Sequence, residues 1–239
     1  MKVKEILNTT AHRPWPLPDE KWKFYQEWKD VIFLHWPVAM DDLRDFVPNN
    51  LTIDVFEGQP WVSLLIFKLE NMRPRFLPAF PPLSNFYEIN LRTYVKAEDK
   101  AGIYFFKLEA SNAISANLAK VATKLPYVYS NIKRDGNNIT STNNKMSSDL
   151  ELQYEIGALK EKKGIDIWLM ERYVLFQTDK SKISKIEIHH YEWNAYDLYI
   201  KNFSCNYPAF QKIIKPPTIT HFSTGVQSVG WMKQEIREE

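Results

Sequence analysis

Residues 87–110, YEINLRTYVKAEDKAGIYFFKLEA, contain the clearest β-hairpin of the sequence. Two runs in which apolar and polar side chains alternate, 87–97 and 102–110, flank the polar turn 98–101, and Gly102 follows that turn. Alternation with a period of two is typical of a half-buried strand, and a short polar turn between two such runs favours an antiparallel hairpin. This stretch therefore predicts an antiparallel pair of strands.

Working outward from the hairpin, most of the remaining signal is also strand. Further strands are expected at 31–36, 51–57, 61–67, 127–134, 139–146, 150–156, 172–178 and 182–190. Helices are expected from about Glu20 to Trp28, at 41–47, around 165–169, and along a stripe of Ile114, Leu118, Val121 and Leu125 that Pro126 ends. The segment 73–86 holds four prolines and is expected to be a loop. Many short strands with a few helices predict one α+β domain over residues 1–239, mostly antiparallel β, as a barrel or a sandwich with helices packed outside.

Composition excludes several classes of function. The chain has 239 residues, only seven glycines and a formal net charge of +2. It contains neither GxGxxG nor GxxxxGK[ST], which argues against the two common phosphate-binding loops. The weak net charge does not indicate nucleic acid as a partner, and no apolar run has the length of a membrane span. The start, MKVKEILNTT, lacks the apolar stretch of a signal peptide, so the sequence predicts a cytoplasmic protein.

The strand 88–95 carries the most informative polar residues. Because side chains alternate along a strand, Glu88, Asn90, Arg92 and Tyr94 share one face, and the apolar residues between them share the other. An acid, an amide, a guanidinium and a phenol in a row are suited to binding a carboxylate, for which arginine offers two parallel hydrogen bonds. The alternative interpretation is the solvated face of an amphipathic strand.

Other candidates for chemistry are weaker. His35, at the end of an apolar run, is either a buried general base or a core histidine whose hydrogen bonds are satisfied. His189 and His190 are adjacent on a strand and would point to opposite faces, so no metal site is expected. The single cysteine, Cys205, predicts a structural thiol. No cofactor is expected.

Several segments together resemble the YqjF-like family of uncharacterised bacterial proteins. They are HRPWPLP (12–18), FLHWPVAMDDLRDFVP (33–48), FYEINLRTYV (86–95), GIYFFKLEA (102–110), LPY (125–127), ERYVLF (171–176) and HFSTGV (221–226). The resemblance extends over nearly the whole chain, and it implies membership of the acetoacetate decarboxylase-like fold group, whose members form a β-barrel around a central pocket.

The resemblance also implies where the chemistry departs from the decarboxylase. That enzyme forms a Schiff base on a lysine that follows a Gly-x-Pro turn after a helix. The comparable turn here ends in Tyr127, and Lys124 precedes the proline. This difference argues against imine chemistry, while Glu88 and Arg92 resemble the acid and the guanidinium that line the pocket of the family.

Three functions remain open on these grounds. The leading hypothesis is a protein that binds a small anionic or carbonyl-bearing organic molecule through Arg92, Glu88, Asn90, Tyr94 and Tyr127, with the HRPWP segment and the loop 76–86 as a lid. The first alternative is a lyase or hydrolase for a small carbonyl compound that uses Glu88, Arg92, Tyr127 or His35 without a Schiff-base lysine. The second is a non-catalytic protein that binds a partner through exposed aromatic residues. The sequence leaves a homo-oligomer open.

Overall fold

The computed structural model describes residues 3–179 and 182–236, and strands dominate it. The longer strands are β1 (Phe24–Pro37), β4 (Gln59–Pro74), β5 (Phe86–Ala97), β6 (Lys100–Ala110), β10 (Ser148–Lys160), β11 (Val174–Asp179), β12 (Lys182–His190), β13 (Ala195–Asn206) and β14 (Ile219–Gly230). The shorter strands are β2 (Thr52–Ile53), β3 (Val55–Phe56), β7 (Tyr127–Tyr129), β8 (Asn131–Asp135), β9 (Asn138–Asn143) and β15 (Gln234–Glu235). The helices are α1 (Val3–Asn8), α2 (Met40–Arg44), α3 (Pro81–Ser84), α4 (Ala113–Thr123) and α5 (Gly164–Met170), with 3₁₀ turns η1 (Asn144–Met146) and η2 (Pro208–Phe210).

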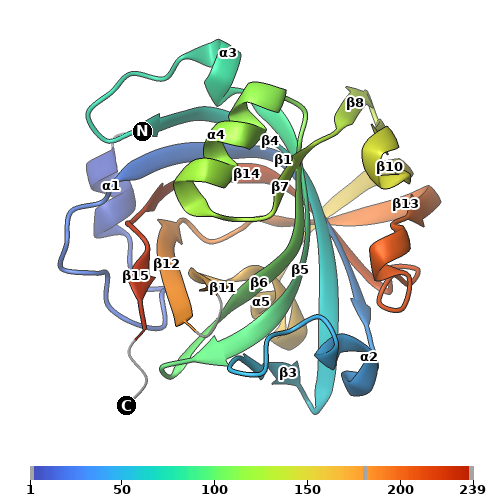
Figure 1. Cartoon of the computed structure of the whole chain (residues 1–239), viewed down its shortest axis with the longest axis horizontal. Helices are drawn as coiled ribbons and strands as arrows, with labels where there is room; N and C mark the ends of the chain where they lie inside the picture. The colour runs from blue at the N-terminus through green and yellow to red at the C-terminus, as the bar shows by residue number, and fades with distance from the viewer. Residues whose placement is uncertain (1–2, 180–181, 237–239) are drawn as a thin grey trace.

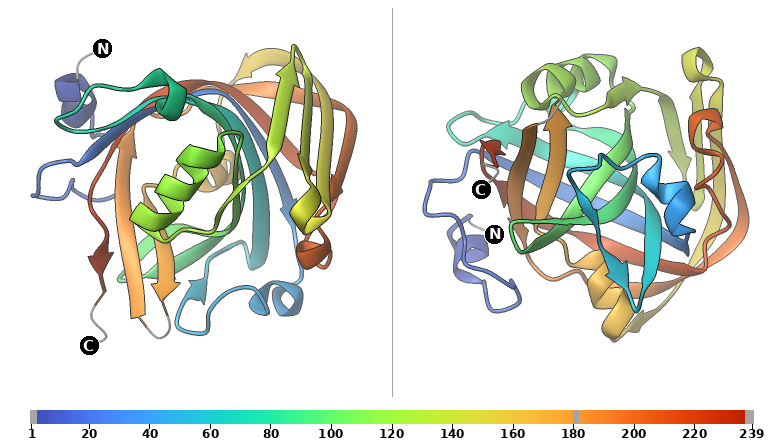
Figure 2. Two further views of the ribbon diagram at one scale, coloured as in Figure 1. Left: turned by 45° about the horizontal axis from the view of Figure 1, so that its top comes forward. Right: turned by 60° about the horizontal axis from the view of Figure 1, so that its bottom comes forward.

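The strand pairings return on themselves. Neighbours follow the order β12-β11-β6-β5-β4-β1-β14, and β14 in turn pairs with β12 at Gly230 and Ile188. Nearly all these pairs are antiparallel; β6 is the exception, because it pairs in parallel with β11 and with β7. Figures 1 and 2 show the resulting ring of strands. The expectation of a mostly antiparallel sheet with few helices is confirmed.

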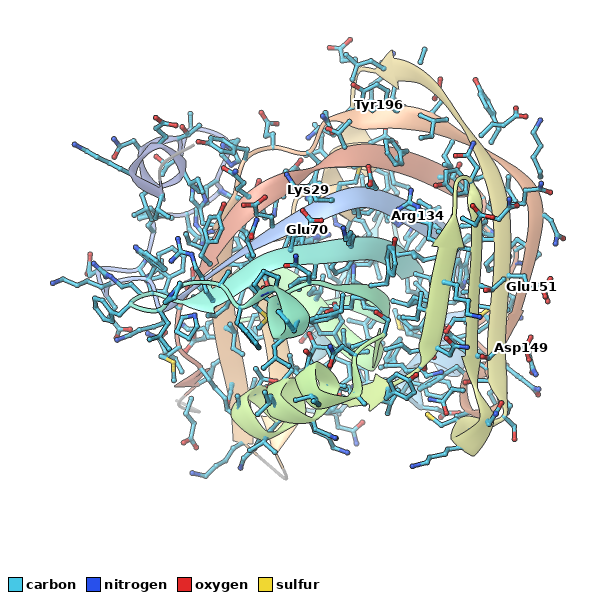
Figure 3. The ribbon with its side chains drawn as sticks, turned by 90° about the horizontal axis from the view of Figure 1, so that it is seen from above. Lys29, Glu70, Arg134, Asp149, Glu151 and Tyr196 are labelled. Atoms are coloured by element: carbon cyan, nitrogen blue, oxygen red, sulfur yellow. The ribbon has the colours of Figure 1, made fainter. Side chains whose placement is uncertain are left out.

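The sheet continues from β14 through β13, β10, β9 and β8, and this second part packs against the outer face of the ring. Apolar side chains of β1 and β4 meet those of β10, such as Leu34, Leu64 and Leu152. The acidic residues Asp149 and Glu151 of β10 point away from this core (Figure 3). The alternation of apolar and polar residues along β10 therefore follows from burial of only one of its faces.

A second apolar cluster fills the interior of the ring. Phe33 of β1, Leu65 of β4, Tyr94 of β5 and Leu108 of β6 belong to it. The helices α4 and α5 lie at opposite ends of the ring (Figure 2), and α5 contributes Leu169 to the cluster. These two helices were expected to pack around the outside of the sheet, whereas they cover its ends.

The helix expected from about Glu20 to Trp28 is wrong, because β1 begins at Phe24 and pairs with both β4 and β14. Two irregularities in the pairing with β4 break the alternation here, one of them around Asp30, whose φ is 51°. A bulged strand loses its period of two, and the apolar residues then imitate helical spacing.

The helix expected at 114–125 is present as α4, but of its apolar stripe only Leu125, just after the helix, packs in the core. Ile114, Leu118 and Val121 are 60%, 56% and 81% exposed. The buried positions of α4 are the small residues Ser115, Ala116 and Ala119. Small side chains allow the helix to lie close across the end of the ring. Among the described residues, no helix combines the length and the apolar character needed to span a membrane.

Candidate functional site

The polar row of β5 points into the ring. Glu88, Asn90, Arg92 and Tyr94 are only 4%, 3%, 7% and 0% exposed. Tyr94 belongs to the interior cluster, and the alternate residues of β5 belong to the core between the two parts of the sheet. The interpretation as a solvated face is therefore wrong, since both faces of β5 are buried.

Tyr127 reaches the row from the connection that follows α4. Lys124 ends α4 in the left-handed conformation, Pro126 follows, and β7 then pairs in parallel with β6, so that Tyr127 lies beside Leu108. Its hydroxyl donates a hydrogen bond to Oε2 of Glu88 over 3.0 Å. The structure thus brings together two of the residues that the sequence singles out.

Burial decides the protonation of this pair. It raises the pKa of Glu88 to about 7, although hydrogen bonds from Tyr127 and Asn90 favour the carboxylate and act in the opposite direction. Burial, together with the neighbouring carboxylate, holds the pKa of Tyr127 well above its usual value. Near neutral pH, Glu88 is therefore able both to donate and to accept a proton, whereas Tyr127 remains a donor.

Arg92 is a buried cation without an acidic partner in the part of the chain that the structure describes. No ion pair joins it to any carboxylate within residues 3–179 and 182–236, and its Nε atom has no hydrogen-bond partner there. Burial, chiefly, and the nearby Arg172 lower its pKa, while the hydroxyl of Tyr94 partly offsets them. By contrast, the buried Arg172 pairs with Asp54 at 2.8 Å.

His35 joins the row from the neighbouring strands. Its Nδ1 atom and Oγ of Ser63 are hydrogen-bonded at 2.6 Å, and the same Oγ lies 2.6 Å from the hydroxyl of Tyr94. That hydroxyl also lies 3.0 Å from the carbonyl oxygen of Leu169, to which it donates. Burial and the nearby His221 hold the pKa of His35 well below its usual range, so the ring is neutral.

Two further polar residues extend the row, and the sequence did not single them out. Nε2 of His221, on β14, lies 2.9 Å from Oδ1 of Asp166 on α5, and its ring lies 5.5 Å from that of His35. Burial lowers the pKa of His221 although Asp166 acts to raise it. The sequence offered only the histidine of the HFSTGV segment as a signal, since its acidic partner lies 55 residues away.

Several buried polar atoms of the residues that line the interior have no hydrogen-bond partner among the described residues. They are Asn90 Oδ1, Arg92 Nε, His35 Nε2, His221 Nδ1 and Gln177 Oε1. Buried polar atoms are nearly always paired, with protein, water or ligand. The interior therefore offers donors and acceptors to a small polar molecule.

The remaining candidates lie elsewhere. Arg13, of the HRPWP segment, forms an ion pair with Glu187 at 2.5 Å. Glu187 follows the interior residue Ile186 on β12 and therefore points to the opposite face, so the segment packs on the outer side of the ring. His189 and His190 bond to different backbone carbonyl oxygens. The described residues contain no group of three side chains suited to hold a metal ion. Cys205 carries a free thiol whose pKa burial raises to about 12.

The ring of strands encloses a row of buried polar side chains among apolar ones, and known structures share this fold. Over 98% of both chains, the structure matches acetoacetate decarboxylase with a TM-score of 0.62 at 14% identity. It also matches the enduracididine biosynthesis enzyme MppR in complex with pyruvate, over 93% of both chains, with a TM-score of 0.59 at 9% identity. The chain therefore has an acetoacetate decarboxylase-like fold.

The sequence comparisons define the family within that class. The model of DUF2071, described as an uncharacterized conserved protein, matches residues 25–227. The uncharacterized protein YqjF of Bacillus subtilis (strain 168) is 40% identical over 185 residues, which cover 74% of this chain and 76% of that protein. The chain belongs to the DUF2071 family, and the resemblance drawn from its segments is confirmed.

Proposed function

We propose that this protein binds a small carboxylate that also carries a carbonyl group, within the ring of strands, which acts as a barrel around the ligand. The observation that carries the proposal is Arg92, a buried guanidinium without an acidic partner among the described residues. A buried charge is costly unless it is paired, and a ligand carboxylate would pair with it through two hydrogen bonds. Asn90 and Tyr94 flank Arg92 on the same face, and Glu88 with Tyr127 would hydrogen-bond the carbonyl oxygen.

Two further observations support a ligand of this class. MppR, which shares the fold, was solved in complex with pyruvate, a small 2-oxo acid. In addition, the Nε atom of Arg92, a donor on the inward face of β5, has no hydrogen-bond partner among the described residues. A ligand carboxylate would accept a hydrogen bond from it.

Thermal unfolding in the presence of pyruvate, 2-oxobutyrate and acetoacetate tests the proposal. The wild-type protein should be stabilised in proportion to ligand concentration, because only the folded state binds. Arg92→Met should abolish the stabilisation. Arg13→Met is the matched control, since it removes another buried arginine, on the outer side of β12, and should retain the full ligand-induced shift. Equal ligand-induced shifts in wild type and Arg92→Met would reject the role of Arg92.

A catalytic role for the same site is the second candidate, and the pKa of Glu88 near 7 favours it. A carboxyl that changes protonation near neutral pH is suited to general acid–base catalysis on a bound carbonyl compound. Glu88 would remove a proton from the carbon beside the carbonyl, and the hydroxyl of Tyr127 would stabilise the enolate oxygen. This chemistry would serve a lyase or a hydrolase without a Schiff-base lysine.

Proton exchange measures this candidate directly. In D₂O, the wild-type protein should catalyse exchange of the C3 protons of 2-oxobutyrate, observed by proton NMR, and Glu88→Gln should lose most of this activity. Exchange at the same rate in Glu88→Gln would exclude Glu88 as the base. Reduction with borohydride in the presence of the oxo acid is the complementary experiment, because a ligand trapped on any lysine would contradict chemistry without an imine.

A further inference from the structure

A cleft of about 280 Å³ lies between β6, β11 and the connection from α4 to β7. Its outer part is lined by aromatic rings of four segments, namely Phe46, Tyr104, Phe106, Phe176 and Phe210. These aromatic side chains belong to the apolar core on the outer face of the strand ring or pack against that core. The rings of Phe46, Phe106 and Phe210 lie within 6.0 Å of one another between centroids.

The inner part of the cleft is lined by residues from the opposite face of the sheet. Phe105 and Leu125 line it, and both pack in the interior cluster with Tyr94. Phe105 packs in the interior cluster and Phe106 on the outer core, yet both line this cleft. The cleft is therefore a window through the wall of the ring.

The strand pairings explain the window. On the side of β6 away from β5, β11 pairs only with Ile103 and Tyr104, and β7 pairs only from Leu108 onward. Residues 105–107 lie between these two partners. The pairing of β6 with β5 is also irregular at this level, because Leu91 faces Lys107 and Arg92 faces Phe105.

The window opens at the level of the proposed binding site. Phe105, at its inner end, is the cross-strand neighbour of Arg92, and side chains in such positions have Cβ atoms about 5 Å apart. Two residues beyond Leu125, the hydroxyl of Tyr127 donates to Glu88. The inner end of the window thus adjoins Arg92 and Glu88 of the polar row.

Gln177 gives the window a polar group of its own. This side chain lines the cleft, is 7% exposed, and its Oε1 atom has no hydrogen-bond partner among the described residues. Lys124 and Thr178 also line the cleft, so several polar groups accompany the aromatic rings. Such a mixture is typical of a small-molecule site, in which apolar contacts bind the ligand and polar groups orient it.

We infer that this window is a second subsite of the ligand pocket and that it binds an aromatic or similarly bulky apolar group attached to the oxo acid. The inference rests on the proposed function, since it assigns the carboxylate end of the ligand to Arg92. The volume accommodates a single ring on a short chain, and the aromatic lining offers offset and edge contacts to that ring. The ligand class is thereby narrowed from small oxo acids in general to aryl-substituted 2-oxo acids.

Two probes separate the subsites. Pyruvate has only the group assigned to Arg92, and phenylpyruvate adds the ring. In calorimetric titrations, phenylpyruvate should bind the wild-type protein at least about tenfold more tightly than pyruvate, because the ring buries apolar surface. Phe210→Ala should weaken phenylpyruvate about three- to tenfold and leave pyruvate unchanged, in keeping with the loss of one aromatic contact.

Phe203→Ala is the matched control. Phe203 is a partly buried phenylalanine of β13 that packs on the same outer core but does not line the cleft. Its replacement should change the affinity for neither probe. Phe46→Leu is a second variant that keeps most of the apolar volume, and it should also weaken phenylpyruvate selectively.

The outcomes distinguish the inference from the function on which it rests. Phenylpyruvate that binds no more tightly than pyruvate, or loses affinity equally in Phe210→Ala and Phe203→Ala, would overturn the second subsite. If Arg92→Met retains the affinity for both probes, the proposed function fails. In that case a selective loss of phenylpyruvate binding in Phe210→Ala would still support the window as the site of the ring.

Discussion

Glu88 should make the stability of this protein depend on pH in the direction opposite to most carboxylates. Burial raises its pKa from a usual value near 4.5 to about 7. Between these values the folded state binds a proton that the unfolded state has released, so the free energy of unfolding falls as pH rises. The difference corresponds to about 3 kcal/mol, fully lost above about pH 8.

Glu88→Gln isolates this contribution, because glutamine resembles the protonated carboxyl and does not ionise. Urea unfolding of both proteins at about pH 5 and about pH 8.5 should show the variant gaining about 2.5 kcal/mol over wild type across this range. Glu151→Gln, at an exposed carboxyl of β10, should show no such gain. A difference between Glu88→Gln and wild type that does not change with pH would refute the reasoning.

The neighbour of Glu88 allows a direct measurement of the same pKa. The hydroxyl of Tyr127 donates to the carboxyl and so favours its ionised form. Tyr127→Phe should therefore raise the pKa of Glu88 further, as followed by carbon NMR of the glutamate side chains. A lower pKa in this variant would mean that the phenol does not stabilise the carboxylate.

Two other sites give stability predictions that unfolding experiments can check. Asp54→Ala should destabilise the fold by about 3–5 kcal/mol, since it leaves the buried Arg172 unpaired, whereas Lys96→Ala, which removes the exposed partner of Asp54, should cost less than about 1 kcal/mol. Gly225→Ala should lower the free energy of unfolding by well over 1 kcal/mol, because φ is 113° and the new Cβ would lie 1.9 Å from a backbone oxygen. Gly136→Ala, where φ is 55° and the space around the new Cβ is open, should lower it by about 1 kcal/mol. Equal effects within either pair would contradict the packing described here.

The parts of the fold that the sequence predicts are those that local signals determine. The hairpin of β5 and β6 is predicted almost to its ends, because two alternating runs enclose a polar turn. The strands β13 and β14 were missed. The inward residues of β14 include the polar residues His221, Ser223 and Ser228, although the strand is buried. Its burial depends on pairing with distant strands, so the local sequence does not indicate a buried strand.

The candidate site shows the same division. Alternation placed Glu88 and Arg92 on one face of β5, but it did not decide whether that face is solvated or buried. The closure of the ring buries this polar face, and β8 to β10 bury the opposite, apolar face. The contacts of His35 with Ser63 and His221 depend on the register of β1 with β4 and β14. Such registers are set by tertiary packing, and no single segment of the sequence contains them.

Tyr127 is the residue at which this protein differs chemically from the decarboxylase whose fold it shares. The resemblance to the decarboxylase implies a nucleophilic lysine at this place, and the structure has a phenol that donates to a neighbouring carboxyl. Beside this phenol, burial leaves the pKa of Glu88 at about 7. Under the proposed function, the phenol would hydrogen-bond a carbonyl compound and exchange protons with it in place of covalent bonding, and Arg92 would orient the carboxylate. Proton exchange on a bound oxo acid is the measurement that would decide between binding and catalysis.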